Sequence, residues 1–396
     1  GDFLTYGAGG FARATYTQAS AVPINSSTAT TVYEANVAQT LTSGSTAAAY
    51  ALKVGAVTIS GAGGTTTLQV GPQTAGTQAG LILNGGTIAT SALAFGAAEA
   101  LVYAGPAGGT IAAATQGSGS LVKFGSGALT VTAASQYTGA VFVQQGALIA
   151  ANPSGSATGT GAVTVGPAGT FQVNAGTSTG SAAGTAAQSG GTVRMNGGTL
   201  TGPLVMNDGS TLTGSGTITG TATLSGAITG LTSLTFTGPV TSTATMTYSW
   251  RLNALDDSAA GAGTSYSQLR FNGSPTVLGN GGSSTGFYLN FDLAEGLPDP
   301  NSSDPFWGAA HSWAVMRASP FFQTIWYRGA GFPEFSRGDF SISFDAGFTA
   351  MSVVYTPVPV PEPGALVAVA CAALAAGRTL RRRRAPESRT ETPLRA

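Results

Sequence analysis

The sequence predicts an all-β protein organised around a parallel β-helix, a β-solenoid with about three short strands in each coil. From about Gly117 to Pro239, short apolar segments return every six to eight residues, and Gly, Asn, Ser or Asp brackets each of them. Such alternation between turn residues indicates strands, and no window of this stretch keeps a helical period. The apolar positions of the clearest run are Leu200, Leu212, Ile218, Leu224 and Leu234. The glycines that punctuate this run are Gly202, Gly214, Gly220, Gly226 and Gly238.

The energetics of short coils favour a long stack. Each inward Leu, Val or Ile contributes roughly 1.5–3 kcal/mol when fully buried, whereas ordering the backbone costs about 1–2 kcal/mol per residue. A few coils alone are therefore marginal, and many must stack. We expect Gly at the corners, where a positive φ or a tight bend is required, and Thr on the outer face. The alternative is a disordered Gly/Ser/Thr-rich linker, which the regular spacing of the aliphatic residues disfavours.

Residues 1–116 are expected to form the N-terminal capping coils and the lead-in of the solenoid. Apolar pieces alternate there with Thr-, Ala- and Ser-rich pieces, which predicts short and irregular strands. A cap is needed because an open end exposes unpaired backbone donors and acceptors. The chain begins at Gly1 without a charged n-region and an apolar h-region, so we expect a removed leader or a piece of a longer protein.

Residues 117–240 carry a motif in addition to the strand pattern. The segment GSGSLVKFGSGALTVTAASQYTGAVFVQQGALIA, Gly117 to Ala150, contains a Gly-Ser-Gly…Leu…Lys…Gly…Gly…Leu-Thr-Val strand pair. The pair is followed by Tyr-Thr-Gly at 137–139 and Gly-Ala-Leu at 146–148. The segment resembles the autotransporter-associated β-strand repeats of large exported bacterial proteins. The resemblance implies a parallel β-helix at the cell surface and no particular chemistry.

Residues 241–356 are expected to form a β-rich C-terminal module that closes the solenoid. The part from 245 to 356 holds all four Trp residues and the only His, and it contains five or so longer strand patterns. Aromatic side chains supply large buried areas, so they can give this module the core that thin coils lack.

Residues 357–384 have three consecutive features. Alternate prolines from Pro357 to Pro363 form an extended spacer, and the apolar stretch from Ala365 to Gly377 favours a helix. Its 13 residues span about 20 Å, which is short of a hydrocarbon core of about 30 Å. Snorkelling arginines extend the reach of such a transmembrane-like helix. The basic residues that follow it are Arg378, Arg381, Arg382, Arg383 and Arg384.

This tail resembles the PEP-CTERM sorting signal. The matching residues are Val360, Pro361, Glu362 and Pro363, followed by the apolar segment and the Arg cluster. The resemblance implies recognition and cleavage near the Pro-Glu-Pro by an exosortase-type membrane protease, and release to the envelope or the extracellular matrix. The polar tail at 385–396 extends beyond the point where such signals usually stop.

The charge of the chain bears on its binding partners, and its cysteine content bears on disulfide bonds. Charged residues make up 8% of the chain, against about 25% in an average globular protein. Seven Arg and two Glu lie from Arg378 onward, and the rest of the chain carries nine basic and fourteen acidic residues. A weakly acidic body lacks the basic patch of a nucleic-acid-binding protein, so we expect no nucleic-acid partner. The single cysteine, Cys371, excludes an intramolecular disulfide.

The sequence offers little for catalysis, and we expect a non-enzymatic protein without catalytic residues or cofactors. His311 is the only histidine, and its position beside Trp313 favours a structural role over that of a base. Glycoside hydrolysis needs two acids about 5–10 Å apart across a sugar. Asp256 and Asp257 are adjacent and would point to opposite faces of a strand. Residues 35–250 contain only two acids, at positions 99 and 208.

Two patterns suggest binding without catalysis. The loop 299–304, DPNSSD, spaces oxygen atoms as in part of a calcium site, but it lacks the Gly and the distant Glu of an EF-hand loop. We therefore favour a solvated turn and predict no metal. Trp307, Trp326 and Tyr327 could stack on sugars of a matrix polysaccharide, although packing in the core explains such residues equally well.

Taken together, these patterns predict an exported bacterial cell-surface or extracellular β-solenoid with a structural or adhesive role. Its C-terminal segment would hold it briefly at the inner membrane. The alternative is a carbohydrate-binding protein of an extracellular polysaccharide or biofilm matrix, and a polysaccharide-active enzyme comes third.

Overall fold

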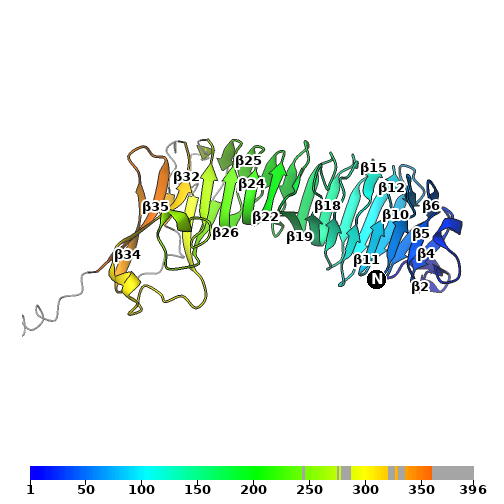
Figure 1. Cartoon of the computed structure of the whole chain (residues 1–396), viewed down its shortest axis with the longest axis horizontal. Coiled ribbons are helices and arrows are strands. Elements are labelled where there is room, and N and C mark those ends of the chain that lie inside the picture. The colour runs from blue at the N-terminus through cyan, green and yellow to red at the C-terminus, as the bar shows by residue number, and fades with distance from the viewer. Residues whose placement is uncertain (243–245, 274–275, 278–286, 320–325, 329–334, 359–396) are drawn as a thin grey trace, which may run out of the picture.

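The chain forms an elongated β-solenoid of about ten coils (Figure 1). A computed structural model describes residues 1–242, 246–273, 276–277, 287–319, 326–328 and 335–358. Within these residues there is no α-helix, only three short 3₁₀ turns. They are η1 (Ile24–Ser26), η2 (Ala259–Gly261) and η3 (Pro305–Gly308). The predicted all-β parallel β-helix is confirmed.

Among the first coils, the four between Val32 and Gly117 each contribute one strand to each of three faces, as predicted. The first face contains β3 (Thr17–Gln18), β4 (Val32–Ala35), β7 (Ala51–Val54), β10 (Gln78–Leu83), β13 (Glu99–Ala104) and β16 (Leu121–Phe124). The second face contains β5 (Gln39–Leu41), β8 (Thr58–Gly61), β11 (Gly86–Ala89), β14 (Gly109–Ile111) and β17 (Leu129–Val131). The third face contains β6 (Thr46–Ala49), β9 (Thr67–Val70), β12 (Ala92–Gly96) and β15 (Ala114–Gly117).

In the later coils, neighbouring strands fuse around the corners. The strands that join the first and second faces are β18 (Val141–Ala150) and β19 (Val163–Asn174). The strands that join the second and third faces are β22 (Thr192–Thr201), β24 (Thr211–Ile218) and β26 (Ala227–Phe236). The short strands beside them are β20 (Ser178–Gly180), β21 (Thr185–Ala187), β23 (Leu204–Met206), β25 (Ala222–Leu224) and β27 (Val240–Ser242).

The register sets the length of a coil. Ala222 pairs with Leu204 before it and with Val240 after it, an interval of 18 residues in both cases. Val163 pairs with Val141, 22 residues earlier. Three of the short apolar segments, which return every six to eight residues, therefore make one coil.

The inward side chains form one continuous core along the solenoid. The five apolar residues of the predicted run, from Leu200 to Leu234, are at most 1% exposed. Strands such as β11, β13 and β28 alternate between buried and more exposed positions, as the pleat requires. Because each interior coil lies between two others, its backbone pairs on both sides and its apolar face is covered.

The punctuating glycines serve two purposes. Gly202 and Gly214 have φ angles of 81° and 93°, which favour glycine. At Gly220 and Gly238 the neighbouring coil leaves no room for a side chain. A Cβ atom at Gly220 would strike the carbonyl of Gly202, and one at Gly238 would strike the carbonyl of Gly220. The corner thus brings successive backbones into close contact.

Parallel stacking continues beyond residue 240 and ends in antiparallel strands. The parallel strands of this part are β28 (Met246–Leu252), β29 (Gln268–Phe271), β30 (Thr276–Val277), β31 (Phe287–Leu293), β32 (His311–Arg317) and β33 (Trp326–Arg328). β35 (Ala350–Pro357) then pairs antiparallel with β32 and with β34 (Gly338–Phe344). Aromatic rings fill the space enclosed here. Trp250 and Trp313 are fully buried, and their ring centroids lie 5.3 Å apart.

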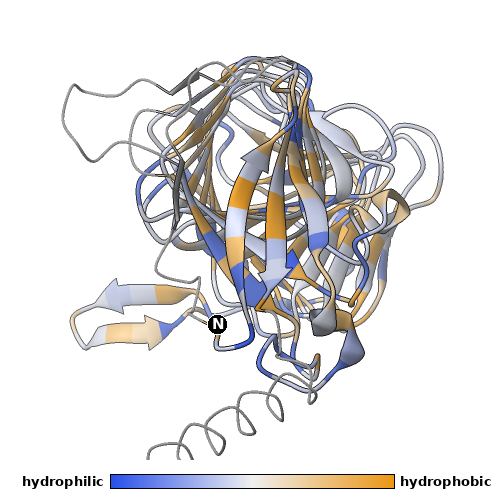
Figure 2. Cartoon of the chain, turned by 90° about the vertical axis from the view of Figure 1, so that its left-hand side faces the viewer, coloured by the Kyte–Doolittle hydropathy of each residue, from blue (hydrophilic) through white to orange (hydrophobic). Residues whose placement is uncertain are grey.

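At the other end, a hairpin precedes the first coil. It consists of β1 (Leu4–Gly7) and β2 (Gly10–Arg13), paired antiparallel, and it projects from the body (Figure 2). Tyr6 and Phe11 contact one another on it, with ring centroids 5.0 Å apart, and each is 77% exposed.

Candidate functional site

The N-terminal coils align polar and aromatic side chains in one column on the outer side of the first face. Gln18 pairs with Glu34, and Glu34 pairs with Lys53. The column continues through the aliphatic Ile82, which is almost fully buried, to the aromatic Tyr103 and Phe124. Since parallel strands lie about 4.8 Å apart, residues that are 16 to 29 positions apart in the chain become neighbours here.

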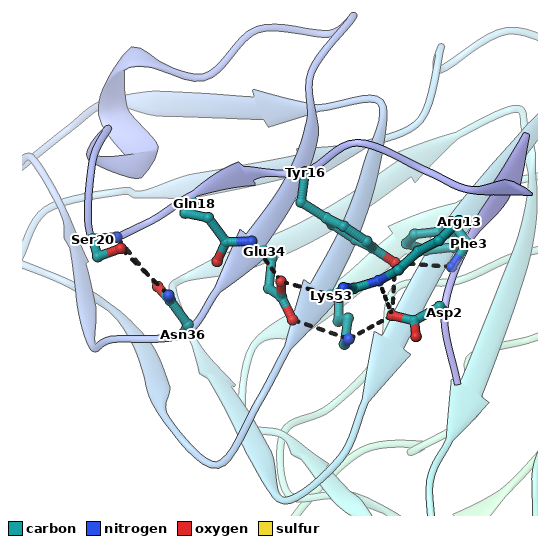
Figure 3. Close-up of polar contacts among 9 residues, drawn as sticks. All are labelled: Asp2, Phe3, Arg13, Tyr16, Gln18, Ser20, Glu34, Asn36 and Lys53. Atoms are coloured by element: carbon teal, nitrogen blue, oxygen red, sulfur yellow. Dashed lines mark hydrogen bonds and ion pairs between the residues drawn. The ribbon is translucent and has the colours of Figure 1, made fainter.

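Four charged residues in this region form what we call the N-terminal clamp: Asp2, Arg13, Glu34 and Lys53. Lys53 Nζ lies 2.6 Å from Asp2 Oδ1 and 3.0 Å from Glu34 Oε1 (Figure 3). Arg13 Nε lies 3.2 Å from Asp2 Oδ1, and Arg13 Nη2 lies 3.7 Å from Glu34 Oε2. The clamp joins the segment before the hairpin to β4 and β7.

Polar neighbours complete the clamp. The Tyr16 hydroxyl donates to Asp2 Oδ1 at 3.2 Å and accepts from the backbone N–H of Phe3 at 2.9 Å (Figure 3). Gln18 Nε2 donates to Glu34 Oε2 at 2.7 Å. Tyr16 thus holds the Asp2 oxygen that contacts Lys53, and Gln18 holds the second oxygen of the Glu34 carboxylate.

The clamp is charged at neutral pH. The hydrogen bond from Lys53 lowers the pKa of Asp2. Burial raises the pKa of Glu34, but hydrogen bonds from Gln18 and Lys53 outweigh it and the net pKa is lowered. Burial likewise lowers the pKa of Lys53, and its bonds to Asp2 and Glu34 reverse this and raise it.

Two adjoining grooves lie on the N-terminal coils, and the first of them borders the clamp at Asp2. The first, of about 520 Å³, is mainly apolar and is lined by Phe3, Tyr103 and Phe124 among others. The second, of about 630 Å³, is more polar and is lined by Glu99, Ser120, Pro72 and the corners of successive coils. Tyr50 and Gln78 line both grooves, so the grooves form one continuous depression.

Within the second groove, three side chains form a polar column on the first face. Gln78 pairs with Glu99 in the sheet, and Ser120 lies on the next coil. Gln78 Nε2 donates to Glu99 Oε2 at 3.3 Å, and Ser120 Oγ donates to Glu99 Oε1 at 3.0 Å. This column was not identified from the sequence. Its only signal there is the recurrence of three polar residues at intervals of 21.

Lys123, a residue of the repeat motif, is the one buried ammonium among the described residues. Its side chain is 0% exposed. Nζ donates to the carbonyls of Gly125 and Gly127 at 2.7 Å each and to that of Gln145 at 2.6 Å. Burial lowers the pKa of Lys123 to about 8. Three donors meet three acceptors, so this residue links two coils from inside.

His311 sits in a packed environment. Its Nε2 lies 2.6 Å from the Phe306 carbonyl oxygen, and its Nδ1 lies 2.9 Å from Asp257 Oδ2. Its ring stacks on Phe306 with centroids 3.6 Å apart. Each ring nitrogen therefore lies within hydrogen-bond distance of an oxygen atom of the protein. This geometry favours the structural role that its sequence context suggested.

The other aromatic and acidic candidates have structural contacts as well. Trp307 is 3% exposed and donates from Nε1 to the Pro298 carbonyl at 2.8 Å, so it is part of the core. Asp256 accepts hydrogen bonds from Ser258 N at 2.8 Å and from Ser265 Oγ at 2.7 Å. For Trp326 and Tyr327 the structure describes the backbone of β33 only.

The loop 299–304 directs its oxygens at its own backbone and at a neighbouring segment. Asp299 Oδ1 accepts from Asn301 N at 2.9 Å, and Asp304 Oδ1 accepts from Phe306 N at the start of η3, also at 2.9 Å. Asn301 Oδ1 accepts from Ser336 N at 2.8 Å. Across the described part of the chain, no three His, Cys, Asp or Glu residues gather as a possible metal site.

The predicted sorting residues lie outside the described residues. This applies to Val360, Pro361, Glu362 and Pro363, to the apolar segment and to the arginines from Arg378 to Arg384. The described ranges contain no helix of sufficient length and apolarity to span a membrane.

Comparison of the chain with models of known protein families, with curated proteins and with solved structures gives no match.

Proposed function

We propose that the chain is an exported β-solenoid of a bacterial cell envelope, with a structural or adhesive role outside the inner membrane. The observation that carries the proposal is the continuous parallel β-helix itself (Figure 1). It is the fold that the resemblance to exported repeat proteins implies. A stack of this length is elongated and presents long outer faces for contact with other molecules, as expected of a scaffold or an adhesin.

The outer surface of the solenoid supports a role in contact with water and with other surfaces. One outward column of the first face passes through Thr164, Ala186, Val205, Thr223 and Thr241. These side chains are small or β-branched, which suits an exposed pleated surface of low charge. Such a surface offers no electrostatic footprint for nucleic acid.

Delivery is proposed to depend on the C-terminal tail. An exosortase-type membrane protease would recognise the sequence Val360, Pro361, Glu362 and Pro363, while the apolar segment and the arginines hold the chain at the inner membrane. In this proposal, residues 241–356 close the solenoid and the tail is a separate sorting element.

A non-enzymatic role is supported by the placement of the two acids of the central region. Glu99 lies on β13, and Asp208 lies two residues after the end of β23. Five coil steps separate these strands along the first face, which at about 4.8 Å per step amounts to about 24 Å. A glycosidase pair needs a separation of about 5–10 Å.

The test of surface location is immunolabelling of intact cells that produce the native protein. We expect antibodies against the solenoid to label unpermeabilised cells or the surrounding matrix. Labelling that appears only after permeabilisation of the inner membrane would contradict the proposal.

The second candidate is carbohydrate binding, and the second groove favours it. An exposed aromatic ring beside a column of hydrogen-bonding side chains is suited to a ligand with one apolar face and several hydroxyl groups.

A further inference from the structure

We propose that the second groove binds an uncharged polysaccharide chain, with Tyr50 as the stacking platform and Glu99 as the main hydrogen-bond acceptor. The inference rests on the proposed extracellular role and names the ligand class and the residues involved. The groove is lined by Tyr50, Pro72, Gln78, Glu99 and Ser120 together with backbone at three corners.

The carboxylate of Glu99 is held in place and retains acceptor capacity. Each of its oxygens accepts one bond within the column, from Gln78 and from Ser120. A carboxylate offers about four lone-pair sites, so about two remain for a ligand. Neighbouring sugar hydroxyls can donate to them, and the amide of Gln78 can donate and accept beside them.

Tyr50 supplies the apolar contact. Its side chain is 47% exposed, while its backbone N–H donates to the Thr31 carbonyl at 2.8 Å. The ring therefore stands on a fixed corner between β6 and β7. Tyrosine combines a flat apolar face with a polar tip, which matches the C–H face and the hydroxyl groups of a sugar.

The walls of the groove are built by strained and close-packed backbone. In the loop between β9 and β10, Gln73 has a φ of 64°, and its Nε2 donates to the carbonyls of Val70 at 2.8 Å and Ala94 at 3.1 Å. A Cβ atom at Gly119 would strike the Ala98 carbonyl. These contacts hold the corners of adjacent coils in fixed positions.

The lining disfavours other classes of ligand. The strands of this face already pair on both sides within the stack, so a peptide cannot add to them as a further strand. The lining residues include one carboxylate and no cationic side chain. Nucleic acids and anionic polysaccharides would therefore meet repulsion without a compensating positive charge.

The test is affinity electrophoresis of the purified full chain in gels that contain laminarin, hydroxyethyl cellulose or dextran as uncharged polymers, or alginate as an anionic one. We expect at least one uncharged polymer to retard the protein and alginate not to do so. Tyr50→Ala and the nearly isosteric Glu99→Gln should each weaken binding about tenfold, since about 1.4 kcal/mol corresponds to that factor. Tyr6→Ala is the control, because it removes an exposed ring from the hairpin.

The inference is overturned if none of the uncharged polymers retards the protein, if only alginate does, or if Tyr6→Ala weakens binding as much as Tyr50→Ala. Circular dichroism of the variants confirms that the solenoid is folded. Failure of the protein to bind the polymers would leave labelling of intact cells unchanged. The two tests therefore distinguish a wrong ligand class from a wrong surface location.

Discussion

The buried ammonium of Lys123 joins two coils through the carbonyls of Gly125, Gly127 and Gln145. Lys123→Met should lower the free energy of unfolding by at least about 1–3 kcal/mol, because it leaves buried carbonyls without a donor. Arg194→Met is the control, since Arg194 is exposed on β22 and should change stability by no more than about 0.5 kcal/mol. Urea unfolding followed by circular dichroism measures the stability of both variants. Equal unfolding midpoints for Lys123→Met and Arg194→Met would refute the structural role of Lys123.

The same residue predicts a dependence of stability on pH. Burial lowers the pKa of Lys123 to about 8 in the folded chain, below its ordinary value of 10.5. Above pH 8 the unfolded chain therefore binds more protons than the folded one, and the free energy of unfolding rises with pH. The rise should appear between about pH 8 and pH 9.5, before tyrosines titrate near pH 10 in the unfolded chain. Urea titrations at several pH values should show this rise in the wild type and not in Lys123→Met.

At the scale of elements, the N-terminal clamp attaches residues 1–16 to β4 and β7 through Lys53. Lys53→Met should loosen this segment, because Asp2 then loses its contact with β7 and only the longer contact between Arg13 and Glu34 still joins the segment to β4. Hydrogen exchange followed by mass spectrometry should show faster exchange in residues 1–16 and little change in the later coils. Arg251→Met removes the pair with Asp292 at the other end and serves as the control. Unchanged exchange in Lys53→Met would show that the clamp does not hold the segment.

The clamp also has a defined pH window. The pKa values of Asp2 and Glu34 are lowered from 3.8 and 4.5, so their contribution is complete above those values and is lost as pH falls further. The pKa of Lys53 is raised from 10.5, so its contribution is complete below that value and is lost at higher pH. Exchange of residues 1–16 should therefore be slowest, relative to the intrinsic rate, between these limits. Protection that persists well below the carboxyl range would contradict this assignment.

The corner formed by Gly202, Gly220 and Gly238 predicts a local packing defect. Gly220→Ala places a methyl group against the Gly202 carbonyl, and overpacking of this kind costs about 1–3 kcal/mol. Gly7→Ala is the control, because a Cβ atom there has no neighbour within 4 Å. Thermal unfolding should show a lower midpoint for Gly220→Ala alone. Equal midpoints for the two variants would contradict the close approach of the coils.

At the scale of the whole molecule, the fold could be predicted because its signal is repeated. The apolar residues of the run from Leu200 to Leu234 are buried in the core, and three apolar segments make one coil. The fusion of strands at β18, β19, β22, β24 and β26 could not be predicted. It depends on how each corner is turned, and the same small residues allow either a turn or a bent strand.

The grooves and the clamp were less accessible from the sequence, because they depend on register. Asp2 reaches Lys53 across 51 positions, and Glu99 meets Gln78 and Ser120 only because adjacent coils here are 21 residues long. A change of one residue in a corner would move each side chain to the other face. Conversely, the sequence left open whether Trp307 stacks on sugars or packs in the core. Its burial shows that it packs in the core, which only the tertiary structure decides.

Export and sorting by the C-terminal tail are central to the proposed function. The most direct test is the intact mass and the location of the native protein, with and without Glu362→Ala. We predict a mature wild-type form that ends near Pro361–Pro363 and lies outside the inner membrane, and an unprocessed Glu362→Ala form. A full-length wild-type product that still carries Arg381–Arg384 and remains in the inner membrane would contradict the account.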